Sequence, residues 1–104
     1  MALTKDFKET IRARAARDHL FKEALFKESI ENLLAGDLET GKALLRNYIN
    51  ATIGFESLAR LTAKSPKSLM RMFSPSGNPR ADNIFGLIHT LQQRTGVTLQ
   101  IQAY

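Results

Sequence analysis

Apolar residues recur every three or four positions along most of the chain, the spacing expected of helices that bury one side. The first such run follows Thr4, a suitable N-cap, and places Phe7, Ile11 and Ala15 four residues apart. The pattern changes near the end, where apolar and polar residues alternate from Val97 onward. We therefore predict an all-α fold of about five helices followed by a short C-terminal β-strand.

A second helical run covers residues 20–35, between the potential N-cap Asp18 and Gly36, a residue that commonly ends helices. Its apolar residues form one wide stripe, which we expect to face the core. Phe26 lies off that stripe, so we predict that it contacts a partner. The stripe consists of Leu20, Phe21, Ala24, Leu25, Ile30, Leu33 and Leu34.

Two further runs complete the predicted core. One covers residues 38–50 after the potential cap Asp37, and the other covers residues 81–94 before Gly96. In the first, the residues expected to be buried are Leu38, Leu44, Leu45, Tyr48 and Ile49. In the second they are Ile84, Phe85, Leu87, Ile88 and Leu91.

The segment between these runs, residues 55–73, has the pattern of two short helices joined by a tight turn at Ala63 and Lys64. Ser65 is a good N-cap for the second helix, and Pro66 occupies its first position, where a missing N–H is tolerated. A helix-turn-helix of this kind places its second helix in the DNA major groove. Leu69, Met72 and Phe73 are expected to point inward, and Lys67, Ser68 and Arg71 outward.

The distribution of charge supports a polyanionic partner. The net charge is +5, and between Ser57 and Ala81 there are five cations and no acid. A field of one sign over the helix-turn-helix segment attracts phosphate. A basic surface without any partner is the simpler alternative, but the overlap with the helix-turn-helix pattern favours DNA binding.

Length and composition indicate one domain, residues 1–104. We divide it into an N-terminal helical extension (1–36), a helix-turn-helix core (37–96) and a C-terminal strand (97–104). A lone strand needs a partner for its backbone groups, either a symmetric copy in a homodimer or the sheet edge of another protein. There is no cysteine, and no stretch predicts a membrane span or signal peptide, so we expect a cytoplasmic protein.

From about Arg14 to Val97 the chain resembles small bacterial antitoxin-type regulators with a Cro/repressor-like (XRE-type) helix-turn-helix, the addiction-module antidote proteins related to the HigA antitoxins. The resemblance rests on residues 45–59, residues 65–72 and the turn at residues 77–79. Two positions differ from many relatives. Ala63 stands where glycine is common in the turn, and Phe55 stands where glutamine is common, so we expect Phe55 to belong to the core.

The resemblance implies a dimeric transcription regulator that represses its own operon and holds a RelE-like ribonuclease toxin inactive, as part of a type II toxin-antitoxin system. A stand-alone phage- or chromosome-type repressor without a toxin is the first alternative. A protein-interaction adaptor that does not bind DNA is the second.

Seven residues are candidate DNA contacts. Lys67, Ser68 and Arg71 lie where base edges come within reach, because arginine and lysine donate to guanine and a serine hydroxyl serves either base or phosphate. Lys64 and Ser65 in the turn are better placed for phosphate, and their alternative role is that of a plain turn and cap. Asn78 and Arg80 precede the last helix, whose free N–H groups attract phosphate.

Met70 is compatible with either a thymine methyl contact or a dimer contact. Enzymatic function is not expected. His19 and His89 stand at no metal-ligand spacing, and no nucleophile or glycine-rich phosphate motif is present. We expect neither a cofactor nor a metal.

Overall fold

Three helices begin at the capping residues that the sequence predicts. In the computed structural model, which describes residues 10, 13–14 and 17–104, Asp18 accepts a hydrogen bond from the N–H of Phe21 at 3.1 Å. Asp37 accepts one from the N–H of Thr40, also at 3.1 Å. Hydrogen bonding to Thr40 holds the pKa of Asp37 below its ordinary value. The third cap, Ser65, belongs to the helix-turn-helix. The predicted helix at Thr4, Phe7, Ile11 and Ala15 lies outside the described residues.

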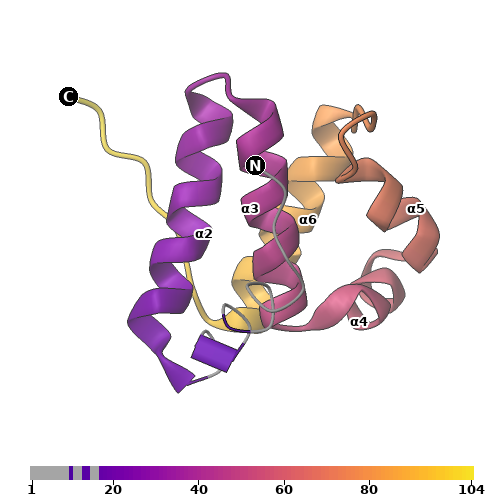
Figure 1. Cartoon of the computed structure of the whole chain (residues 1–104), viewed down its shortest axis with the longest axis horizontal. Coiled ribbons are helices and arrows are strands. Elements are labelled where there is room, and N and C mark those ends of the chain that lie inside the picture. The colour runs from indigo at the N-terminus through magenta and orange to yellow at the C-terminus, as the bar shows by residue number, and fades with distance from the viewer. Residues whose placement is uncertain (1–9, 11–12, 15–16) are drawn as a thin grey trace.

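Between residues 18 and 104 the chain forms five helices (Figure 1). Helices α2 and α3 lie side by side, α4 and α5 form the opposite part of the molecule, and α6 returns to the core between them. The helices are α2 (His19–Leu34), α3 (Leu38–Ala51), α4 (Gly54–Thr62), α5 (Pro66–Met72) and α6 (Ala81–Thr95). Within the described residues, no helix combines the length and apolarity needed to cross a lipid bilayer.

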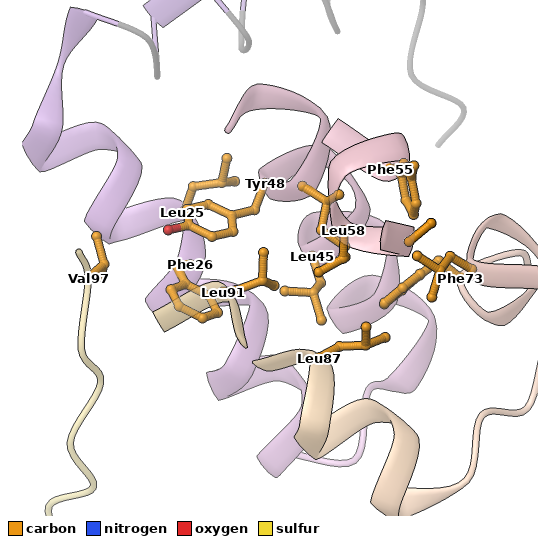
Figure 2. Packing of buried hydrophobic residues seen from close by; sticks show 13 residues of the cluster. Leu25, Phe26, Leu45, Tyr48, Phe55, Leu58, Phe73, Leu87, Leu91 and Val97 are labelled. Atoms are coloured by element: carbon orange, nitrogen blue, oxygen red, sulfur yellow. The ribbon is translucent and has the colours of Figure 1, made fainter. Parts of the chain in front are cut away.

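The centre of the core is an aromatic stack between α2 and α3 (Figure 2). The rings of Phe26 and Tyr48 lie 4.4 Å apart at an angle of 12°, and both residues are fully buried. The Tyr48 hydroxyl donates to Thr95 Oγ1 at 2.6 Å, which ties α3 to the end of α6. Burial raises the pKa of Tyr48, and the bond to Thr95 opposes this shift.

The prediction that Phe26 contacts a partner is therefore wrong. At 100° per residue, Leu25, Phe26 and Ser29 share one side of α2, and that side is the buried one. Apolar residues also occupy the opposite side of this helix, so periodicity could not identify which side packs inward.

Five residues predicted to be buried are instead exposed, the small Ala24 and four large apolar residues. Leu20, Leu34 and Leu38 are 74%, 65% and 57% exposed, and Phe85 is 65% exposed. At 100° per residue, Leu20 lies about 120° and Leu34 about 80° around α2 from Phe26, outside the buried arc of this helix, and Leu38 is the first residue of α3. The other predicted core residues of α3 and α6 are buried or half-buried.

The predicted C-terminal strand is not confirmed. No strand forms among the described residues, and residues 97–104 follow α6 as an extended tail (Figure 1). Val97 is buried and Leu99 packs against the core, but Ile101 is 84% exposed. A single chain offers this tail no second strand, and an unpaired strand has no ladder of hydrogen bonds.

Candidate nucleic-acid interface

Helices α4 and α5 form the predicted helix-turn-helix, joined by the three residues Ala63, Lys64 and Ser65 (Figure 1). The fully buried Leu69 anchors α5 to the core. Phe73, which follows α5, meets the Phe55 ring edge-on at 6.0 Å (Figure 2). Phe55 is 5% exposed, so its predicted place in the core is confirmed.

The turn between the two helices holds an alanine in a backbone conformation that favours glycine. Ala63 has φ +55°, the only positive φ of a non-glycine residue in the described part of the chain. The N–H groups of Ala63 and Lys64 both donate to the carbonyl of Ala59, which closes α4. An L-residue in this region is less stable by roughly 1–2 kcal/mol, so the turn carries local strain.

Replacing Ala63 with glycine is expected to raise the free energy of unfolding by about 0.5–1 kcal/mol, because relief of the left-handed strain exceeds glycine's larger entropy loss. Urea unfolding measures the change. Ala43→Gly, at an exposed helical position in α3, is the matched control and should destabilise by about 0.5–1 kcal/mol. Equal destabilisation by both substitutions would contradict the strain at Ala63.

The outward side of α5 carries Lys67, Ser68 and Arg71, and all three are exposed as predicted. They fall within an arc of about 100°, so they can address one surface together. Met70 is 48% exposed on the same short helix. Because the helix is anchored through Leu69, these side chains are presented on a fixed backbone.

A shallow groove brings five of the seven candidate residues together. It runs between α5 and the loop that leads to α6, and Ser76 and Asn83 are further polar residues in its wall. The candidates that line it are Lys64, Ser65, Ser68, Arg71 and Asn78. Lys67 and Arg80 do not line this groove. Sequence periodicity missed Ser76 and Asn83, because their approach to α5 depends on how the loop folds back.

The hydroxyl groups of Ser65 and Ser68 are linked at the start of α5. Ser65 Oγ accepts from the N–H of Ser68 at 3.1 Å and donates to Ser68 Oγ at 2.8 Å. Ser65 is thus engaged as the helix cap, the alternative role considered for it. Ser68 Oγ accepts the bond from Ser65 and so keeps its own proton for donation to an acceptor on a ligand.

At the start of α6, an acid already occupies the position proposed for phosphate. Asp82 accepts from the N–H of Asn83 at 2.9 Å, and its carboxylate lies 3.3 Å from Nε of Arg80. Both side chains are well exposed, so this ion pair adds little stability and can open. A phosphate bound here has to displace or neutralise Asp82, which makes Arg80 a weaker candidate than the residues of α5.

The other described ion pairs, Arg14–Asp18 and Lys27–Glu31, lie on or next to α2, where His19 Nε2 also lies 2.9 Å from Glu23 Oε1. Lys64, Lys67 and Arg71 therefore take part in no ion pair among the described residues. Their positive charge is not neutralised by neighbouring side chains, which is the arrangement that attracts phosphate. His19 and His89 lie on different helices, and the described residues contain no group of three or more His, Asp or Glu side chains able to hold a metal.

A buried lysine fixes the loop that forms one wall of the groove. Lys42 of α3 is only 7% exposed, and its Nζ donates to the carbonyls of Ser74 at 2.9 Å and Gly77 at 2.7 Å. Gly77 itself packs so closely on the end of α5 that a Cβ there would lie 2.1 Å from the carbonyl oxygen of Arg71. These contacts hold the loop closely against the end of α5.

Sequence analysis did not single out Lys42. A signal existed, because residue 42 lies between residues 38 and 45 at helical spacing, on the side that bears apolar residues. A lysine at such a position is either a solvated edge residue or a buried donor, and the sequence alone does not identify acceptors more than 30 residues away.

Comparison with known proteins gives no family, because no family model, curated protein or solved structure matches the chain.

Proposed function

We propose that this chain is a sequence-specific DNA-binding regulator of transcription that acts as a dimer. The proposal is carried by three exposed side chains of α5, Lys67, Ser68 and Arg71. The two cations among them have no ion-pair partner in the described residues, and the buried Leu69 anchors this second helix of the helix-turn-helix to the core. Such a helix fits a major groove, and these are side-chain types that donate to base edges and phosphates.

In this mechanism α5 enters the major groove and the flanking groups fix its position. Arg71 donates two hydrogen bonds to a guanine, and Lys67 donates to a base acceptor or a phosphate beside it. Lys64 and Asn78 line the shallow groove between α5 and the loop before α6, and they contact the DNA backbone and set the register. Two copies read two half-sites whose centres lie about 34–36 Å apart or a multiple of that distance.

The deciding experiment is binding to duplex DNA from the region upstream of the chain's own gene, compared with unrelated duplex at two salt concentrations. A preference of roughly a thousandfold or more for the upstream duplex supports a specific regulator. Equal binding to both duplexes, falling steeply with salt, contradicts sequence readout and leaves only attraction between the basic surface and phosphate.

Replacing Arg71 with alanine is expected to weaken binding to the specific duplex by about 1–3 kcal/mol. The fold should be unchanged, because the side chain is exposed. The matched control is Arg94→Ala, which removes the same charge from the last turn of α6. Circular dichroism checks the fold, and fluorescence titration measures affinity. Equal losses from the two substitutions would show that Arg71 acts only as a general charge.

We further propose that the regulator is the antitoxin of a type II module and neutralises a RelE-like toxin. The support for this part is the resemblance of residues 45–59, 65–72 and 77–79 to addiction-module antidotes. Co-expression with a ribonuclease encoded next to the gene tests it. Restored growth and co-purification of a stable complex are expected, whereas DNA binding without rescue favours the stand-alone repressor.

A further inference from the structure

The exposed apolar residues of this chain are concentrated on one surface. Two grooves adjoin there and share Ile30 and Leu34 in their walls. One lies between the α2–α3 turn and the start of α6, and the other lies between α2 and the C-terminal tail. Of the eight large exposed hydrophobic residues in the described chain, six line these grooves: Leu20, Leu34, Leu38, Phe85, Ile101 and Tyr104. This concentration marks an interaction surface.

The tail supplies both apolar side chains and unused backbone hydrogen-bonding groups. Its residues alternate, so Val97, Leu99 and Ile101 share one side. The N–H of Leu99 donates to Oε1 of Gln92 at 2.8 Å. Beyond Leu99, no backbone group of the tail has a hydrogen-bond partner within the described residues. The chemistry that completes such a segment is another β-strand.

The charge pattern favours a second copy of the same tail as that strand. Residues 97–104 contain no charged side chain, so two tails meet without repulsion despite the net charge of +5. On α2 beside the tail, Lys27 lies 4.0 Å from Glu31, so this nearby cation is offset by an opposite charge. The unneutralised cations lie on the helix-turn-helix, and Figure 1 places the tail on the other side of α3 from α5.

We propose that residues 97–104 of two copies pair antiparallel as a symmetric two-stranded ribbon. The apolar side of the ribbon, which includes Ile101, covers Leu20 and Leu34 of both copies. Each tail thereby gains the hydrogen bonds that a single chain lacks, and α5 of each copy remains free. This inference rests on the proposed dimeric regulator and gives it a contact surface. Its test contains no DNA, so its outcome is independent of whether the chain binds DNA.

Analytical ultracentrifugation of the full chain over a wide concentration range tests the pairing. The wild type is expected to form a dimer, whereas Ile101→Lys and Ile101→Glu each remain monomeric at the same concentration. Mixing the two variants should restore the dimer mass, because opposite charges then meet across the two-fold axis. Gln100→Lys, which places the same charge on the polar side of the ribbon, is the control and should still dimerise.

Circular dichroism and thermal unfolding should match the wild type for all three variants, because Ile101 and Gln100 are exposed. A wild-type chain that stays monomeric overturns the pairing and leaves the tail for the sheet edge of a different protein. Dimers of Ile101→Lys place the interface elsewhere, and an equimolar mixture that stays monomeric rules out symmetric contact at residue 101.

Discussion

Replacing Phe26 with alanine is expected to lower the free energy of unfolding by about 3–5 kcal/mol, the range for a fully buried phenylalanine. The substitution removes a ring stacked on Tyr48 and leaves a cavity where α2 meets α3. A loss of this size is a large part of the stability of a domain of this length. Urea unfolding followed by circular dichroism measures it, and an unchanged denaturant slope would indicate that the unfolding transition is otherwise the same.

The matched control for this prediction is Phe85→Ala. Phe85 is 65% exposed in α6, so its removal should change stability by no more than about 0.5 kcal/mol. The helical pattern alone predicts the reverse order, with Phe85 in the core and Phe26 on the surface. The pair therefore distinguishes the three-dimensional packing from the sequence pattern, and a larger loss at Phe85 would contradict the packing described here.

Replacing Lys42 with methionine is expected to lower the free energy of unfolding by about 2–4 kcal/mol, because two carbonyls lose a charged donor at once. Methionine preserves most of the side-chain volume, so the effect comes from the ammonium rather than from a cavity. Among the described residues the carbonyl of Gly77 accepts from Lys42 alone, whereas the carbonyl of Ser74 also accepts from the N–H of Gly77 at 3.0 Å. The loop before α6, which forms one wall of the shallow groove, should then lose its fixed position, and DNA binding should also weaken.

Lys27→Met is the control for this substitution. Lys27 is exposed on α2, and its one ion-pair partner in the described part of the chain, Glu31, lies 4.0 Å away on the surface. Its replacement should change stability by less than about 0.5 kcal/mol. Chemical unfolding gives the stability change for both variants, and amide hydrogen exchange of residues 74–79 reports on the loop. Unaltered exchange in Lys42→Met would mean that other packing holds the loop in place.

The local features of this fold are predictable from the sequence. The caps Asp18, Asp37 and Ser65 act within three residues, so short-range chemistry specifies them. The two short helices α4 and α5 are equally predictable from the sequence. The spacing of Leu58 and Leu69 and the proline after Ser65 define them. The exposure of Lys67, Ser68 and Arg71 follows from the same periodicity.

The remaining features depend on contacts between distant segments. Helix α2 has apolar residues on both sides, so only its packing against α3 decides that Phe26 is inside and Leu20 and Leu34 are outside. Lys42 finds its carbonyl acceptor only once the loop carrying Gly77 has folded onto α3. The alternation of the tail correctly describes its residues but cannot create a strand in a single chain, because the second strand is missing.

The stack of Phe26 on Tyr48 has a consequence for anyone who wishes to shorten this protein. The first 36 residues look dispensable from the sequence, since the helix-turn-helix follows them. A fragment that begins at Asp37 would nevertheless leave one face of the fully buried Tyr48 ring in water, together with the surface of α3 that α2 covers. The smallest unit able to fold is therefore larger than the helix-turn-helix proposed to contact DNA. A shortened fragment should begin at Asp18 or earlier.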